Sequence, residues 1–137
     1  MTRFDHISLL LVFGLLFVTG SAQECTLDIG GKNTETIIKI FQLNEEQIGK
    51  MEMWQGELDI KTKDIEDQIR QLMEKHPQKT PEDLTLFAKK YDALKDQMVN
   101  TSKAYDTKLI AIFNERQYQR YVDLCIEALR TPIVVPE

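Results

Sequence analysis

The chain has 137 residues, 28% of them charged, and a formal net charge of −5 at pH 7. This balance argues against nucleic-acid binding, which needs a basic face. It also gives no reason to expect attraction to an anionic membrane surface.

Residues 1–22 have the pattern of a cleaved secretory signal. Arg3 gives a weakly basic start, residues 7–18 are apolar, and residues 20–22 are small, as a cleavage site before Gln23 requires. The apolar run is short for a bilayer span, which favours cleavage over a retained membrane anchor. We expect an exported mature domain of about 115 residues without membrane contact after cleavage.

Cys25 and Cys125 are the only cysteines, and both follow the predicted cleavage site. An even pair in an exported protein favours a disulfide. Closing a loop of about 100 residues stabilises by about 4.7 kcal/mol in the chain-entropy model. The alternative is two unpaired thiols, with Cys125 a core residue.

The next stretch predicts helices. Residues 23–34 are expected to be extended, a short helix is expected over 35–42, and no glycine follows Gly56. The later composition, rich in Glu, Lys, Gln, Leu, Ile and Met, is typical of helices. From Glu45, apolar residues recur at alternating spacings of three and four, which indicates a long helix with a partner helix. They are Ile48, Met51, Leu58, Ile65, Ile69 and Leu72.

A loop at 76–80 separates this helix from a second one. Pro77 disfavours helix at His76, and Thr80 is a predicted N-cap with Pro81 at the first helical position and Asp83 as box partner. The second stripe comprises Leu84, Phe87, Tyr91, Leu94, Met98, Tyr105 and Ile112. Two arms of about 30 residues, each about 45 Å long, predict an antiparallel helical hairpin.

Pairing the two stripes around the loop gives a predicted register. Met51 is expected to meet Tyr105, and Gln55 is expected to face Thr101 in a polar layer that fixes the pairing.

One short motif occurs twice, about seventy residues apart, as an apolar residue, Asn, Glu, any residue and Gln. Asn is a preferred N-cap, and a Gln three residues later can complete a capping box. The motif residues are Leu43, Asn44 and Gln47 in the first copy and Phe113, Asn114 and Gln117 in the second. The apolar residue before each cap is expected to close on Ile48 or Tyr118 as a hydrophobic staple.

The second copy opens a last helix. Its predicted apolar face comprises Tyr118, Tyr121, Val122, Cys125, Ala128 and Leu129. Thr131 and Pro132 are expected to end it, so that the helical domain spans 35–130. The tail 131–137 is too short to fold alone and is expected to pack on the surface or stay mobile.

The sequence offers little for catalysis or for cofactors. Beyond residue 22 the only histidine is His76, in the predicted loop, and no cluster of Cys and His has zinc spacing. Acidic residues alternate with Lys along helix faces, and no glycine-rich phosphate loop is present. We expect no enzyme activity, no metal and no cofactor.

Five apolar residues lie outside the seam, where a two-helix hairpin cannot bury them. They are Met53, Trp54, Ile60, Leu86 and Val99. Either the short helices or a partner copy cover them, or they form a partly exposed surface that binds varied apolar segments, for which methionine is suited.

The duplicated motif in an exported all-α chain resembles the LTxxQ motif pair of the Spy/CpxP family of periplasmic proteins. The resemblance covers roughly residues 42–129, with Asn in place of Thr at both caps and Phe113 in place of Leu. It implies a periplasmic location and a cradle built from a dimer of hairpins. Family members act as ATP-independent chaperones or as regulators under envelope stress, and the metal-binding relatives use histidine clusters that this chain lacks.

Two functions follow from this resemblance. The first is a chaperone or envelope-stress protein that holds unfolded clients on its helical surface. The second is a structural or regulatory adaptor that binds one specific envelope partner through the same surface. A homodimer is a candidate assembly for both functions.

Overall fold

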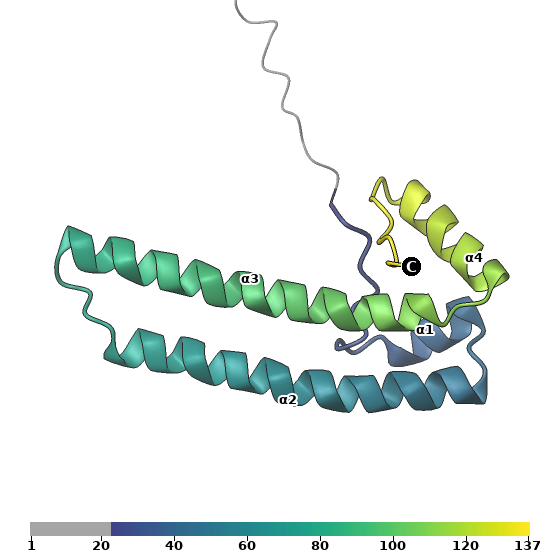
Figure 1. The fold of residues 1–137 in the computed structure, drawn as a ribbon, viewed down its shortest axis with the longest axis horizontal. Helices are drawn as coiled ribbons and strands as arrows, with labels where there is room; N and C mark the ends of the chain where they lie inside the picture. The colour runs from purple at the N-terminus through teal and green to yellow at the C-terminus, as the bar shows by residue number, and fades with distance from the viewer. Residues whose placement is uncertain (1–22) are drawn as a thin grey trace, which may run out of the picture.

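The computed structural model describes residues 23–137, and this range contains four α-helices and no β-strand (Figure 1). The helices are α1 (Thr34–Phe41), α2 (Glu45–Lys75), α3 (Pro81–Ala111) and α4 (Glu115–Glu127). The predicted all-α fold is confirmed. The predicted secretory signal lies outside the described residues.

The helices α2 and α3, of 31 residues each, form the predicted antiparallel hairpin. Asn44 caps α2 and Thr80 caps α3, each in a capping box, and Pro81 occupies the first turn of α3. These boxes satisfy backbone N–H groups that a helix start leaves without partners. The predicted loop and the predicted caps at the starts of the two long helices are therefore confirmed.

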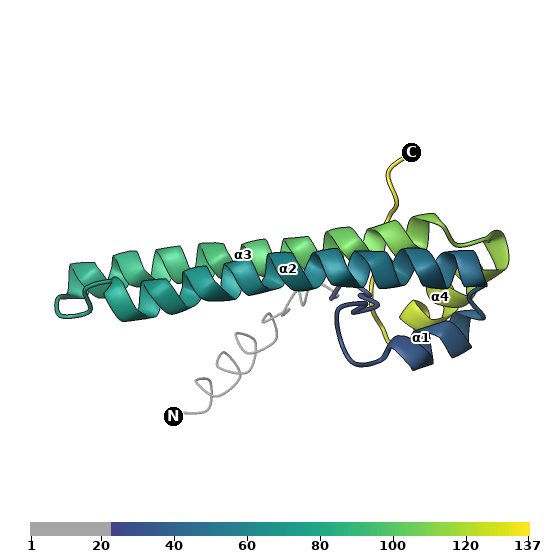
Figure 2. The same cartoon turned by 90° about the horizontal axis from the view of Figure 1, so that it is seen from below.

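The short helices α1 and α4 lie together at the end of the hairpin opposite its loop (Figures 1 and 2). The main buried cluster lies there, with Ile29, Met51, Leu109 and Tyr121 among its members. The half of the hairpin nearer the loop consists of two helices alone, and Ile65 is the one apolar seam residue described as buried in it. Of the other seam residues of this half, Leu84 is exposed, and the rest are half-buried: Ile69, Leu72, Phe87, Tyr91 and Leu94.

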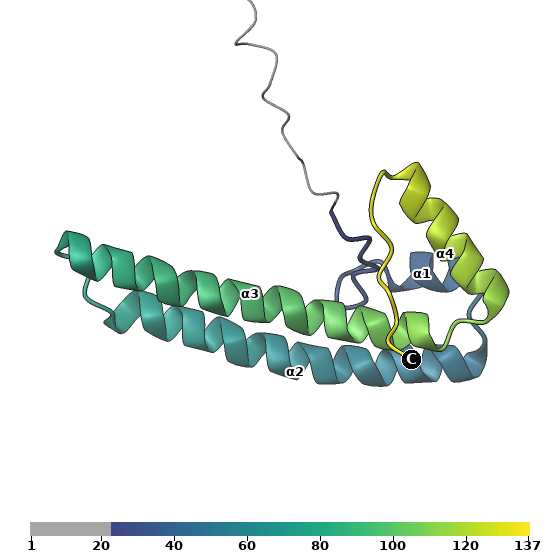
Figure 3. The ribbon, with the colours of Figure 1, turned by 45° about the horizontal axis from the view of Figure 1, so that its top comes forward.

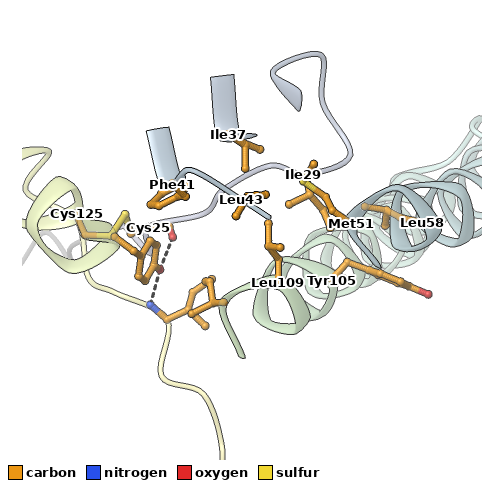
Figure 4. Packing of buried hydrophobic residues seen from close by; sticks show 13 residues of the cluster. Cys25, Ile29, Ile37, Phe41, Leu43, Met51, Leu58, Tyr105, Leu109 and Cys125 are labelled. Carbon is orange, nitrogen blue, oxygen red and sulfur yellow. Dashed lines mark hydrogen bonds between the residues drawn. A yellow bond between two sulfur atoms is a disulfide. The ribbon is translucent and has the colours of Figure 1, made fainter. Parts of the chain in front are cut away.

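The predicted disulfide is present. Cys25 and Cys125 are bonded, with Cα atoms 5.6 Å apart, and Figure 4 shows the bond beside Phe41 and Leu43. It ties residues 23–33, which we call the strap, to α4. A single β-bridge between Glu24 and Thr131 adds a backbone link between the two ends of the described chain.

The predicted end of the last helix is wrong. The helix α4 stops at Glu127, and Leu129 has a φ of 55° and is 85% exposed, so it does not belong to the buried face. The N–H of Leu129 donates to the Ile126 carbonyl and that of Arg130 to the Cys125 carbonyl. This bond pattern is a Schellman motif, with Leu129 in the left-handed position usually held by glycine.

The tail beyond α4 turns back toward the hairpin and is packed in part (Figure 3). Ile133 is buried and Val135 packs against the main cluster, whereas Val134 is exposed.

The predicted polar layer between the two long helices is also wrong. The Gln55 amide donates to the Ile29 carbonyl and the Thr34 hydroxyl, and the Thr101 hydroxyl donates to the Gln97 carbonyl within α3. Gln55 therefore faces the strap, because the strap offers an unpaired carbonyl that an isolated hairpin lacks.

The pairing at this level differs accordingly. The Tyr105 hydroxyl donates to Glu57 at 3.0 Å, and the Lys61 ammonium lies 5.3 Å from the ring centroid. Tyr105 thus reaches a part of α2 that lies beyond Met51, the residue it was predicted to meet.

Candidate functional site

The two motif copies meet in space. The Nε2 atom of Gln47 donates to Oε1 of Gln117 at 2.7 Å, and Nε2 of Gln117 donates to Oε1 of Gln47 at 2.9 Å. Both side chains are buried. Each glutamine also accepts the backbone N–H of its own cap residue, Asn44 or Asn114, as the capping boxes predict.

The remaining bonds of this pair join all four helices. Gln47 donates its second amide hydrogen to the Ile112 carbonyl at 2.9 Å, and Gln117 donates to the Phe41 carbonyl at 3.0 Å. The Phe41 and Phe113 rings lie 4.9 Å apart beside them. Every polar atom of the two amides has its full set of partners. The motif is therefore a structural junction and leaves no group free for a ligand.

The sequence predicted the two caps but not their contact. The one signal for the contact was that both motif copies end in glutamine. A buried primary amide needs a partner that both donates and accepts hydrogen bonds, and a second primary amide is such a partner. The predicted staple contacts with Ile48 and Tyr118 stay predictions.

Asp106 on α3 binds the strap through backbone hydrogen bonds. Its Oδ2 accepts the N–H groups of Leu27 and Asp28 at 2.9 and 3.0 Å, and its Oδ1 accepts that of Ile29 at 3.0 Å. Burial raises the pKa of Asp106, and the three N–H donors oppose this shift because they favour the carboxylate. Sequence reasoning missed this residue, which looks like one of many acidic residues on a helix.

Tyr121 on α4 links the strap to the tail. Its hydroxyl donates to the Cys25 carbonyl at 2.7 Å and accepts the Ile133 N–H at 2.8 Å. Burial raises the pKa of Tyr121, so the hydroxyl stays a donor. Together with the disulfide and Asp106, it fixes the strap against α3 and α4.

A groove runs between α2 and α3 along the side that the strap leaves open. It joins two hollows that share Ala93, and we call it the hairpin groove. Its wall on α3 consists of Lys90, Ala93, Gln97, Asn100 and Ala104, and its floor includes Leu72, Leu94, Thr101 and Tyr105. On α2 it is lined by Lys61, Gln68, Gln71 and Lys75, and it ends at His76 and Pro77.

The strap lies on the other side of the hairpin. Residues of the strap and Leu58, Met98 and Ser102 line a separate hollow. Ser102 is nine residues from Ala93, which at 100° per residue places the two on opposite faces of α3. The chain thus covers one side of its own hairpin and leaves the other open.

The hairpin groove is positively charged in an acidic protein. Lys61, Lys75 and Lys90 line it, whereas Asp96 is its one acidic lining residue. None of the three lysines belongs to an ion pair within residues 23–137. Asp64 lies on the same stripe of α2 and accepts a hydrogen bond from Gln68.

The five predicted client-binding residues do not form one patch. Helical spacing places Trp54 on the stripe of Lys61 and Leu86 on the stripe of Lys90 and Ala93, so both lie in line with the groove, although neither lines it. Leu86 is exposed, and half-buried Trp54 has the Lys108 ammonium 6.0 Å from its ring centroid. The other three, Met53, Ile60 and Val99, are exposed and lie outside the groove.

A further hollow, between α1 and α4, is lined by charged side chains of both signs, among them Lys39, Arg120 and Asp123. Within residues 23–137 no group of His, Cys, Asp and Glu is placed to hold a metal ion. The same part of the chain has no helix that is long and apolar enough to cross a bilayer.

The fold and the groove define a class: a small, disulfide-bonded helical hairpin with one side left uncovered by the described residues. In comparisons with family models, curated proteins and solved structures, nothing matches this chain.

Proposed function

We propose that the protein is an exported, ATP-independent chaperone or envelope-stress protein that binds unfolded clients on its hairpin. The observation that carries this proposal is the half of the hairpin near the loop. There two helices stand alone, their seam is half-buried, and large apolar side chains such as Ile60, Met73 and Leu86 are exposed. The half-buried seam together with these exposed side chains offers apolar contacts that an unfolded client needs.

Two further features support the proposal. The Cys25–Cys125 disulfide is consistent with an oxidising, exported location. The motif pair that resembles the Spy/CpxP family lies at the starts of α2 and α4, and the periplasmic location rests on that resemblance.

The test is light scattering of a thermally unfolding model enzyme, without nucleotide, at increasing ratios of this protein. We expect aggregation to be suppressed at stoichiometric amounts. The double variant Ile60→Gln/Leu86→Gln should suppress less, whereas Ile126→Gln/Leu129→Gln, which also changes two exposed apolar residues, on and after α4, should match the unaltered protein. Absence of suppression at several-fold excess would exclude the chaperone function.

The second candidate is an adaptor for one envelope partner. The hairpin groove favours it, because a defined charge pattern around an apolar floor selects among ligands. Binding measurements with several unrelated unfolded proteins separate the two functions: a chaperone binds many of them with similar affinity, and an adaptor binds none of them well. Analytical ultracentrifugation of the same samples tests the homodimer.

A further inference from the structure

We propose that the hairpin groove binds an acidic, amphipathic α-helix of a partner polypeptide, which lies against α2 and α3 as the third helix of a bundle. This inference rests on the proposed function, because both place a polypeptide on the hairpin. It goes further in naming the face, the conformation of the ligand and its charge.

The shape of the groove fits a helix. Ala93 and Ala104 stand one above the other on the α3 wall, and Asp96, Gln97 and Asn100 line the groove between them. These short side chains let a third helix approach closely, while Leu72 and Leu94 offer apolar contacts for residues spaced three and four apart. The stretch from Lys90 to Tyr105 is about 22 Å long, which accommodates a helix of about 15 residues.

Particular side chains lie at the two ends of the groove. At one end, Glu57 accepts a hydrogen bond from Tyr105 and lies 3.8 Å from Lys108, whose ammonium also lies near the Trp54 ring. At the other end, the chain turns at His76 and Pro77. These residues mark the length over which a ligand helix would contact the groove.

The charge of the groove selects an acidic ligand. Lys75 and Lys90 flank the apolar floor near the loop, Lys61 flanks it further along, and none of them has a carboxylate partner among the described residues. Glutamates on both sides of a ligand's apolar stripe would pair with these lysines. A basic helix would instead place its charges beside all three lysines and would find one carboxylate partner in the groove lining, Asp96.

On the side opposite the groove, the hairpin already binds an apolar segment, the strap. The strap inserts Ile29, 1% exposed, against the cluster that contains Leu58. The Ile29 carbonyl accepts a hydrogen bond from Gln55, and the Ile29 N–H donates one to Asp106. The open side has the same two helices and no such segment from residues 23–137. A helix from a partner supplies the missing cover.

The experiment uses the disulfide-bonded protein and a constrained helical peptide of 16 residues, without tryptophan, that carries leucines at spacings of three and four and four flanking glutamates. A matched peptide has lysines in place of the glutamates. Trp54, the sole tryptophan of the chain, reports binding at the groove end through its fluorescence, and labelled peptide gives the affinity by anisotropy.

We expect the acidic peptide to bind and the basic peptide to bind at least about tenfold more weakly. The double variant Lys75→Glu/Lys90→Glu should weaken the acidic peptide about tenfold and strengthen the basic one, because two attractive contacts become repulsive. The control Lys32→Glu/Lys39→Glu makes the same change of net charge at exposed lysines of the strap and α1 and should leave both affinities within about twofold. Circular dichroism verifies that both variants keep their helices.

Equal affinity for the two peptides, or equal effects of the two double variants, would overturn the groove assignment. The aggregation assay is run on the same preparations. Suppression of aggregation without peptide discrimination rejects the groove inference alone. Charge-selective peptide binding without suppression supports the groove and rejects the chaperone function.

Discussion

At the scale of single residues, Gln47 and Gln117 carry two hydrogen bonds to each other and one each to a carbonyl of another element. Removing either amide leaves buried donors and acceptors without partners, which costs more than the net value of the bonds themselves. We expect Gln47→Ala and Gln117→Ala each to lower the free energy of unfolding by about 2–3 kcal/mol. Urea denaturation measures this change.

The double variant tests whether the pair acts as a unit. Its loss should be smaller than the sum of the single losses by about 1–2 kcal/mol, because the first substitution already breaks the mutual bonds. Gln119→Ala, at an exposed position of α4, is the control and should cost less than about 0.5 kcal/mol. Additive losses from the two buried sites would contradict the shared network.

Asp106 gives a second prediction at this scale. Asn has the same shape but places an NH2 group where one carboxylate oxygen meets one or two strap N–H groups. We expect Asp106→Asn to lower the free energy of unfolding by about 2–3 kcal/mol near neutral pH. Amide hydrogen exchange should show loss of protection at Leu27, Asp28 and Ile29.

The pH dependence follows from the raised pKa of Asp106. A carboxyl whose pKa is higher in the folded than in the unfolded protein binds its proton more tightly when folded, so its contribution to stability is fully present below the unfolded pKa of about 3.9 and is lost as the pH rises through the folded pKa. The stability difference between the unaltered protein and Asp106→Asn should therefore narrow from pH 4 upward. A constant difference across that range would show that the folded pKa is not raised.

At the scale of secondary structure, the C-terminus of α4 rests on a residue poorly suited to it. Leu129 adopts a φ of 55° at the position where helices usually place glycine. Glycine reaches this conformation without the Cβ strain, so Leu129→Gly should raise the free energy of unfolding by about 0.5–1 kcal/mol. Thermal unfolding measures it. Ile126→Gly, also exposed but inside α4, should lower stability by about 0.5 kcal/mol.

The same position shows which parts of an element the sequence predicts. The starts of α2, α3 and α4 were predictable because Asn44, Thr80 and Asn114 carry the side chains that cap a helix. The end of α4 was not, because Leu129 has no preference for the left-handed conformation and the apolar pattern continues through it. Helix caps can be predicted from sequence because they depend on a few neighbouring residues. A strained backbone conformation at a helix end cannot, because the surrounding fold imposes it.

Between elements, the limits of prediction have another cause. The seam periodicity of α2 and α3 fixes which faces meet, but a heptad stripe fits its partner at several registers. The observed pairing depends on the strap, which takes the bonds of Gln55 and leaves Tyr105 to Glu57. The groove charges could be read as lysines in the sequence, but their gathering on the side opposite the strap required the fold.

At the scale of the whole molecule, long-range links at one end hold together a hairpin that is otherwise thin. The disulfide joins residues 100 positions apart, Tyr121 holds the strap at Cys25 itself, and Asp106 holds it a few residues further along, at residues 27–29. In the chain-entropy model, the crosslink restricts the unfolded chain by an amount equivalent to about 4.7 kcal/mol for a loop of this size. Stability should depend on this link more than on any single contact.

The last prediction concerns the Cys25→Ala/Cys125→Ala variant. We expect it to lose about 3–4 kcal/mol in urea denaturation, because the unfolded chain regains its freedom while both buried sites keep small apolar side chains. Reduction of the unaltered protein should cause a similar loss and have no effect on the variant. In this variant the amides of the strap should exchange faster than in the disulfide-bonded protein. Because Asp106 still binds the strap, they should exchange more slowly than in a variant that also carries Asp106→Asn. Equal exchange in the two cysteine-free proteins would show that the disulfide alone holds the strap in place.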